Sequence, residues 1–180
     1  SAVVLWTRVL GQLPAARLML LTREEPEHAA LLRRRFSEAG GNLEQLWFVP
    51  RASQTKYLEY HHAVDLMFDP FPYNGGVTTC DALWMGVPVL TLAGEAYVSR
   101  QGVSVLSNVG LNECIAETAE DFVAKALAWA RDPARAAELR RGLREKVRRS
   151  PLMDYASYAS ELGEVFRSLG ERSQSARRKG

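Results

Sequence analysis

Two adjacent glycines, two threonines and an aspartate form the segment of this sequence with the clearest potential for chemistry. Gly75 and Gly76 allow a tight turn and close approach of a ligand to the backbone, because neither carries a Cβ atom. Thr78 and Thr79 follow at the expected start of a helix, where the first amides lack acceptors and the helix dipole favours an anion. Asp81 is placed to bind a sugar hydroxyl. The pattern predicts a nucleotide diphosphate at this helix N-terminus.

The same residues also have simpler explanations, which the sequence alone leaves open. Gly75 and Gly76 could form an ordinary turn, and Thr78 could cap the helix. Asp81 could be an acid near the helix start that complements the dipole. The segment is neither a lysine-containing phosphate loop nor the dinucleotide fingerprint, because the lysine is missing and the glycine spacing differs.

Arg100 is the second candidate for contact with a diphosphate or its sugar. It ends another glycine-bearing loop, which begins at Gly94, and a planar guanidinium on the same rim could neutralise phosphate. His61 and His62 have no pattern of Ser, Asp or Cys partners, so structural roles are favoured for them. We find no metal-ligand cluster, and we expect neither a metal nor a cofactor.

Alternating strand and helix patterns position these residues. Apolar runs predict buried strands at 17–22, 46–49, 64–68 and 87–92, with a further short strand at 113–116. Helices are expected at 2–13, 26–39, 53–62, 78–85, 99–109, 118–131, 133–148 and 154–169. This order predicts an α/β fold, a doubly wound, Rossmann-like parallel sheet followed by C-terminal helices. The loops 50–53, 69–79 and 93–101 should share the ligand-binding rim at the strand carboxyl ends.

The composition is that of an ordinary globular domain, with 47% hydrophobic and 24% charged residues. A net charge of +2, without aromatic residues among the basic ones, gives no indication of nucleic acid binding. Cys80 and Cys114 suggest neither a disulfide framework nor a zinc site. Without a signal peptide or a membrane-spanning run, we expect a cytoplasmic protein with no membrane partner.

The domain organisation follows from the same patterns. We predict one domain over residues 1–170 and a disordered polar tail over 171–180. The chain opens on a helical pattern without a start methionine, which is typical of a piece of a longer protein.

A longer motif around the glycine turn resembles a known family. From Asn74 to Pro88 the chain reads Asn-Gly-x-x-Thr-x-x-Asp-x-Leu-Trp-x-Gly-x-Pro, and it continues with Ser99-Arg100, Gly110-Leu111 and Ser150-Pro151-Leu152. This is similar to the protein O-linked N-acetylglucosamine transferase family, to its bacterial members and the plant Spindly-type fucosyltransferases. The resemblance covers nearly the whole chain and ends near Leu169.

The resemblance implies the C-terminal half of a two-domain GT-B glycosyltransferase, the half that binds the nucleotide of a UDP-sugar. By this resemblance Gly76, Val77 and Thr78 contact the diphosphate, and Asp81 binds the ribose. The loop of Arg51, Ala52 and Ser53 would meet the uracil through backbone groups.

The chain departs from the family pattern at the base and at the phosphates. Tyr57 stands where the family often has a histidine beside the base, and Gln54 stands where a lysine can occur. Gly76 and Val77 replace residues that are often polar, so backbone amides should bind more of the phosphate. A family lysine that assists the leaving diphosphate, the N-terminal GT-B half and the tetratricopeptide repeats are absent from residues 1–180.

The expected reaction is inverting transfer of a sugar, N-acetylglucosamine first among the options, from UDP to a serine or threonine of an acceptor protein. The catalytic residues cannot be named from this chain, and we expect residues 1–180 alone to be inactive. The alternatives are another GT-B enzyme, such as a polysaccharide glycosyltransferase or a nucleotide-sugar epimerase, and a non-catalytic nucleotide-binding scaffold.

Overall fold

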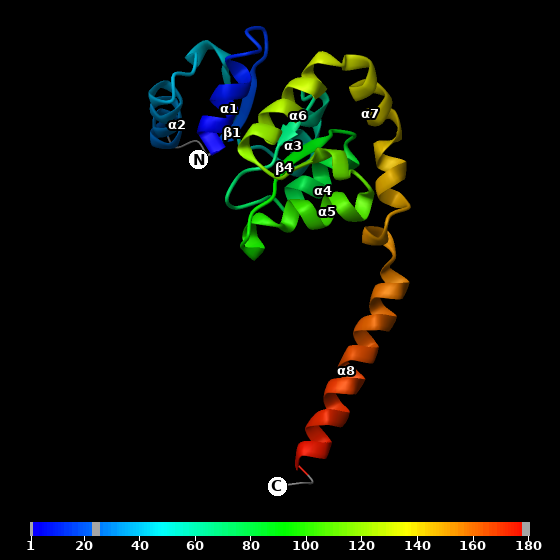
Figure 1. The fold of residues 1–180 in the computed structure, drawn as a ribbon. Helices are drawn as coiled ribbons and strands as arrows, with labels where there is room; N and C mark the ends of the chain where they lie inside the picture. The colour runs from blue at the N-terminus through cyan, green and yellow to red at the C-terminus, as the bar shows by residue number, and fades with distance from the viewer. Residues whose placement is uncertain (1, 23–25, 178–180) are drawn as a thin grey trace.

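The computed structural model describes residues 2–22 and 26–177. In chain order the helices and strands are α1 Ala2–Leu10, β1 Leu18–Thr22, α2 Pro26–Glu38, β2 Leu46–Pro50, α3 Gln54–Tyr60, β3 Met67–Phe68, α4 Val77–Trp84, β4 Val89–Leu92, α5 Gln101–Val109, β5 Ile115–Ala116, α6 Ala119–Arg131, α7 Pro133–Arg148 and α8 Tyr155–Arg177. Short 3-10 turns connect several of them, at 43–45, 61–63, 97–99, 112–114 and 151–153. The predicted order of strands and helices is thus confirmed (Figure 1).

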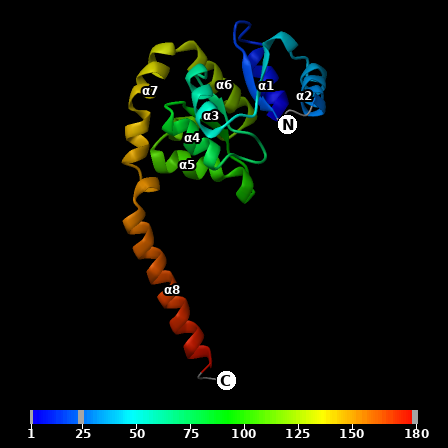
Figure 2. The ribbon, with the colours of Figure 1, turned by 180° about the vertical axis from the view of Figure 1, so that it is seen from behind.

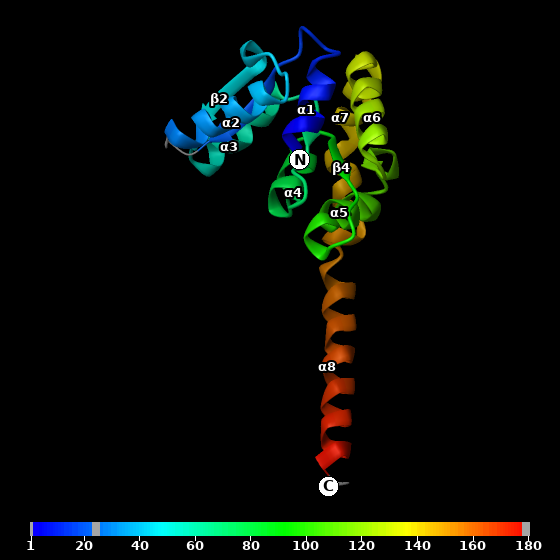
Figure 3. The same cartoon turned by 60° about the vertical axis from the view of Figure 1, so that its left-hand side comes forward.

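The strands form two hydrogen-bonded groups, and every pair is parallel. Strand β1 pairs with β2, with Leu18 opposite Leu46, and the second group has the order β3-β4-β5. Helix α1 lies between the two groups in Figure 3. The α/β class with parallel strands is therefore as predicted, whereas a single continuous sheet is not what these residues form.

Helices cover both faces of the second group. Side chains of a strand point alternately to its two faces. Val89 of β4 accordingly packs with Leu83 of α4 and with residues of α5 and α7. Its neighbour Leu90 packs on the opposite side with Leu5 of α1 and with residues of α6. All four residues of β4 are buried, which makes it the centre of the doubly wound core.

The first group has its own smaller core beneath α1 and α2. Leu10 of α1 and Phe36 of α2 are buried there against Leu46 of β2. Other residues of α1 belong to the core of the second group, so this one helix contacts both groups.

Helix α8 extends away from the rest of the chain (Figures 1 and 2). It carries exposed apolar side chains at helical spacing: Tyr155, Tyr158, Leu162, Val165, Phe166 and Leu169. The helix continues to Arg177, so the structure differs over 171–177 from the prediction of a disordered tail. Glu171 and Arg172 favour helix by local propensity, which needs no apolar face. Residues 178–180 of that predicted tail lie outside the described residues.

Candidate functional site

The candidate site begins at the carboxyl end of β3, where a buried carboxyl group fixes the glycine turn. Asp69 is only 1% exposed. Its Oδ1 accepts a 2.7 Å hydrogen bond from the backbone N–H of Gly75, and its Oδ2 accepts one of 2.7 Å from the hydroxyl of Thr91 in β4. Asp69 therefore ties the turn to two neighbouring strands.

Asn74 anchors the turn on its other side. Its backbone N–H donates to the carbonyl of Val98 over 2.8 Å, and its Nδ2 donates to the carbonyl of Pro70 over 2.9 Å. The loop includes a cis peptide bond between Phe71 and Pro72. The 69–76 and 93–100 loops are thus joined, as expected for neighbours on one rim.

Gly75 has no space for a side chain. An added Cβ would lie 2.5 Å from the hydroxyl oxygen of Thr78 and 2.8 Å from that of Thr79. The absence of a Cβ lets the turn fold directly against the first residues of α4. This is the close backbone approach for which the sequence predicted a glycine.

Helix α4 starts with free amide groups. It is eight residues long, and Gly76 at its N-cap provides no side-chain hydrogen bond. Within the described part of the chain, the N–H groups of Val77, Thr78 and Thr79 have no hydrogen-bond acceptor, whereas that of Cys80 donates to the carbonyl of Gly76. Val77 and Thr78 are exposed, so the helix begins at the surface with an uncapped dipole, whereas Thr79 is buried. The cap alternative for Thr78 is therefore not what forms.

Thr79 points inward instead. It is fully buried, and its hydroxyl oxygen makes no hydrogen bond with the described residues. The hydroxyl nevertheless faces Asp69 and helps to lower the pKa of that carboxyl group. Thr79 supports the turn from below, and its buried backbone amide lies at the helix start without an acceptor among the described residues.

Asp81 and Tyr57 approach each other from different helices. Both are partly buried, Tyr57 in α3 and Asp81 in α4. Burial raises the pKa of the Tyr57 phenol, and the negative charge of Asp81 raises this pKa further. The tyrosine ring also packs edge-on against His61, with ring centroids 5.0 Å apart. Ala52 is half-buried in the loop before α3, on the same chain segment as Tyr57.

Arg100 borders a cavity beside the glycine turn. The cavity has a volume of about 520 Å³ and is lined by Gly76, Tyr97, Arg100, Gln101, Val103, Ser104 and Val105. The Arg100 guanidinium donates a 3.0 Å hydrogen bond to the carbonyl of Gly94, which holds the end of this exposed side chain against the loop. The structure thus brings Arg100 next to Gly76.

Three residues of this region were not selected from the sequence. Asp69, Thr91 and Gln101 all take part, and Gln101 Oε1 lies 3.2 Å from the position of a Cβ added to Gly76. Asp69 carried a usable signal, since it is an acid at a strand end directly before a glycine turn. Thr91 carried no such signal, because a threonine within an apolar strand is interpreted as a core residue.

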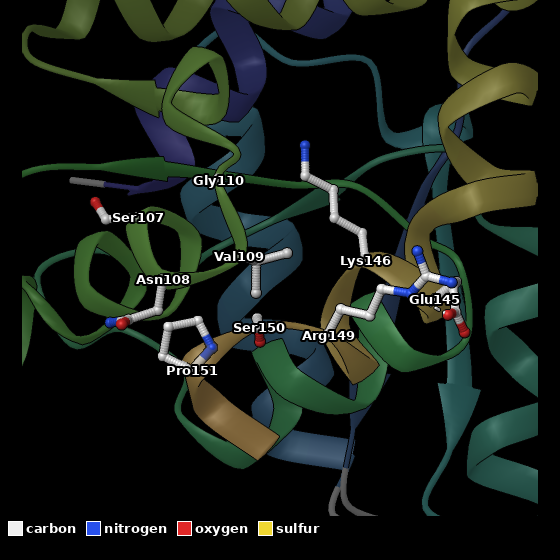
Figure 4. A pocket seen from close by; sticks show the side chains of 9 residues that line it. All are labelled: Ser107, Asn108, Val109, Gly110, Glu145, Lys146, Arg149, Ser150 and Pro151. Atoms are coloured by element: carbon white, nitrogen blue, oxygen red, sulfur yellow. Dashed lines mark hydrogen bonds and ion pairs between the residues drawn. The ribbon is translucent and has the colours of Figure 1, made fainter. Parts of the chain in front are cut away.

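A second cavity lies elsewhere, between the ends of α5 and α7 (Figure 4). Its volume is about 490 Å³, and none of the predicted site residues lines it. Glu145 at its edge is bound by both Arg148 and Arg149, and hydrogen bonds from these arginines lower its pKa to about 2. In Figure 4 the Arg149 and Glu145 side chains lie together, so the negative charge of Glu145 is already compensated.

Neither a metal centre nor a membrane span is found in the ranges that the structure describes. Those residues contain no group of three or more His, Cys, Asp or Glu side chains that could hold a metal ion. Each helix in them is too short or too polar to cross a bilayer.

The environment of Asp69 predicts a pH dependence of stability. Burial raises its pKa above the ordinary 3.8, and hydrogen bonds from Gly75 and Thr91 offset only part of this effect. Between the unfolded and folded pKa values the folded state binds more protons, so the contribution of Asp69 to stability is fully present below the unfolded pKa. It is lost as the pH rises through the folded pKa.

Urea denaturation from pH 4 to pH 7 checks this expectation. The free energy of unfolding of the wild type, minus that of Asp69→Asn, should fall as the pH rises, because asparagine does not titrate. A difference that is constant, or that grows with pH, would show that burial does not dominate the titration of Asp69.

Comparisons with known proteins identify relatives along nearly the whole chain. The family model described as glycosyl transferase family 41 matches residues 1–162. The probable UDP-N-acetylglucosamine–peptide N-acetylglucosaminyltransferases SPINDLY of Solanum lycopersicum and Petunia hybrida are 32% and 33% identical over 175 residues, which is 93% of this chain. The UDP-N-acetylglucosamine–peptide N-acetylglucosaminyltransferase of Caenorhabditis elegans is 25% identical over 97% of the chain.

A solved structure agrees with these relatives. A mutant of the Thermobaculum terrenum O-GlcNAc transferase superposes with a TM-score of 0.86 at 34% identity, over 93% of this chain and 32% of that one. The chain spans only 18% of the length of the two plant relatives. The fold, the α4 motif and the family match agree, and the chain belongs to glycosyl transferase family 41.

Proposed function

We propose that this chain is the UDP-sugar-binding half of an inverting glycosyltransferase that moves N-acetylglucosamine from UDP-GlcNAc to serine or threonine of a protein. The observation that carries the proposal is the open start of α4, with three free amides beside the Asp69-anchored turn. Family membership supports the donor and the acceptor, because the similar plant and nematode proteins are named as UDP-N-acetylglucosamine–peptide transferases.

The diphosphate would lie at the helix start. The amides of Gly76, Val77, Thr78 and Thr79 would donate to its oxygens there, and the helix dipole would add a partial positive charge. Gly75 lets the backbone come close, and the exposed Arg100 across Gly76 can neutralise a second phosphate.

The uridine would extend from there toward α3. Asp81 would accept hydrogen bonds from the ribose hydroxyls, and the Tyr57 ring beside it would flank the uracil. Backbone groups at Ala52 would contact the polar edge of the base. The proximity of Tyr57 and Asp81 fits this order, because base and ribose are adjacent in a nucleotide.

The binding site also has a catalytic role in this scheme. The acceptor hydroxyl oxygen forms a bond to the anomeric carbon on the face opposite the diphosphate, the bond from that carbon to the phosphate oxygen breaks, and the acceptor proton leaves to a base. Negative charge grows on the departing UDP. Donors already oriented at that charge lower the barrier without reorganisation.

The acceptor side of the cleft would come from outside residues 1–180. We propose an N-terminal GT-B half, preceded by tetratricopeptide repeats, as the source of the acceptor-binding surface and of the proton-accepting base. This chain would then act on the donor only.

Titration calorimetry with UDP tests the donor site. Asp81→Ala should weaken UDP binding about tenfold, because the ribose loses a charge-assisted hydrogen bond worth about 1.5 kcal/mol. Asp65→Ala is the matched control, since Asp65 is exposed and precedes β3 at the opposite end from the turn. Equal UDP affinity of the Asp81→Ala variant and the wild type, both folded by circular dichroism, would remove Asp81 from the site.

A further inference from the structure

His61 is a buried histidine that has no role in the donor site as proposed above. It follows α3 directly and begins the 3-10 turn at 61–63, and only 6% of it is exposed. The neighbouring His62 is exposed. Buried polar side chains in folded proteins bind specific partners, so the contacts of His61 indicate what it holds in place.

The imidazole of His61 binds Tyr57 in two ways. Its Nδ1 lies 3.2 Å from the Tyr57 carbonyl oxygen, and Nδ1 carries the proton because a carbonyl can only accept. The two rings also stand nearly perpendicular, at an angle of 86° with centroids 5.0 Å apart, which is an arrangement that aromatic pairs favour. One side chain therefore holds both the backbone and the ring of Tyr57.

The Tyr57 ring needs such support because it lies at the border of the site. Tyr57 is only partly buried, and the charge of Asp81 is near enough to raise its pKa. A partly exposed ring can adopt more than one staggered rotamer. A contact that selects one rotamer before binding lowers the entropic cost of ordering the ring against a ligand.

Helix α7 in turn fixes the backbone of His61. The Arg140 guanidinium donates a 2.7 Å hydrogen bond from Nη2 to the His61 carbonyl and a 3.0 Å bond from Nη1 to the Val64 carbonyl. A cation at the end of a helix also complements its dipole. The two bonds span the 61–63 turn, and the planar fork of the guanidinium fixes both carbonyls at once.

The base of the Arg140 side chain is held by α4. A Cβ added to Gly86, just after this helix, would lie 3.1 Å from the Arg140 carbonyl oxygen and 3.2 Å from its Cγ. The end of α4 can therefore pack directly on α7 because residue 86 is a glycine. Arg140 thus connects the end of α3 with α4, the helix that carries Asp81.

We propose that His61 and Arg140 are positioning residues for the uridine of the donor. Arg140 fixes the backbone of His61, the His61 imidazole holds the Tyr57 ring, and the ring is oriented to flank the uracil before UDP binds. Both residues act through Tyr57 and not by contact with the nucleotide. The inference rests on the proposed function and names the residues that give its base subsite a fixed shape.

A double-mutant cycle in the full-length protein, measured by titration calorimetry with UDP, tests this coupling. His61→Leu has neither a ring nor a hydrogen-bond donor, and it should weaken UDP binding about fivefold. In a Tyr57→Ala background the same change should alter the affinity by less than about 1.5-fold, because the ring that His61 holds is gone. A similar loss in both backgrounds, or no loss in either, would overturn the proposal.

Two further histidine variants separate positioning from general support of the fold. His61→Phe keeps a ring against Tyr57 and should bind UDP within about twofold of the wild type. His62→Leu is the matched control at the exposed neighbour and should leave the affinity unchanged. If His61→Phe bound UDP as weakly as His61→Leu, the ring contact would not be what positions Tyr57.

Arg140→Met tests the second positioning residue, because methionine donates to neither carbonyl. It should weaken UDP binding about threefold, again only while Tyr57 is present, whereas Arg141→Met at the exposed neighbour on α7 should have no effect. Equal affinity of Arg140→Met and the wild type would remove Arg140 from the proposal. A wild type that binds no UDP would refute the proposed function itself, while UDP binding with additive effects of the variants would refute only this coupling.

Discussion

Replacing Asp69 by alanine should weaken UDP binding and destabilise the domain at the same time. The change leaves the Gly75 N–H and the Thr91 hydroxyl without their acceptor. Water cannot easily replace this acceptor, because Asp69 is only 1% exposed. Each buried unsatisfied group costs about 1–3 kcal/mol, so the loss of the acceptor for two groups should lower the free energy of unfolding by about 2–6 kcal/mol. The freed turn no longer holds the amides at the start of α4, and UDP affinity should fall more than about tenfold.

Asparagine at this position separates geometry from charge. Its side-chain oxygen can accept from Gly75, and its amide can donate to the Thr91 oxygen, so Asp69→Asn should recover most of the UDP affinity that alanine loses. Calorimetry with UDP and urea denaturation of both variants provide the measurement. If asparagine were as damaging to UDP binding as alanine while the protein stayed folded, the negative charge of Asp69, and not its anchoring of the turn, would be responsible.

The glycine turn could be predicted from the sequence because the residues that specify it are close together in the chain. Gly75, Gly76 and Thr78 lie within four positions, and turn geometry and free helix amides follow from such short patterns. The Asp69–Thr91 bond joins residues 22 positions apart on adjacent strands. Whether these two side chains meet depends on which strands pair and in which register. No local sequence pattern specifies the pairing or the register.

Strand β3 shows how tertiary contacts shift an element boundary. The apolar run predicted a strand over 64–68, but pairing is limited to Met67 and Phe68. The Val64 N–H donates to the carbonyl of His61, and the Val64 carbonyl accepts from Arg140 of α7. The backbone groups of Val64 thus bind a turn residue and a distant arginine, and neither bonds to β4. The residues next to Val64 in the sequence could not indicate the contact with Arg140.

Alanine at Gly102 should destabilise the protein, and alanine at Gly142 should stabilise it. Both glycines lie in helices, where alanine is favoured over glycine by about 1 kcal/mol. A Cβ at Gly102 would lie 2.1 Å from Asp69 Oδ2 and 2.5 Å from the Thr91 hydroxyl oxygen, whereas a Cβ at Gly142 meets nothing within 4 Å. The clash forces the Asp69 carboxylate away from its two donors.

Thermal unfolding of the two variants checks this pair. Overpacking and the lost hydrogen bonds at Gly102→Ala should lower the melting temperature by about 10 °C, while Gly142→Ala should raise it by about 3 °C. UDP affinity should fall only for Gly102→Ala, because the displaced carboxylate releases the Gly75 turn. Equal, small increases in melting temperature for both variants would mean that α5 shifts to admit the methyl group. Asp69 would then not be held tightly enough to position the start of α4.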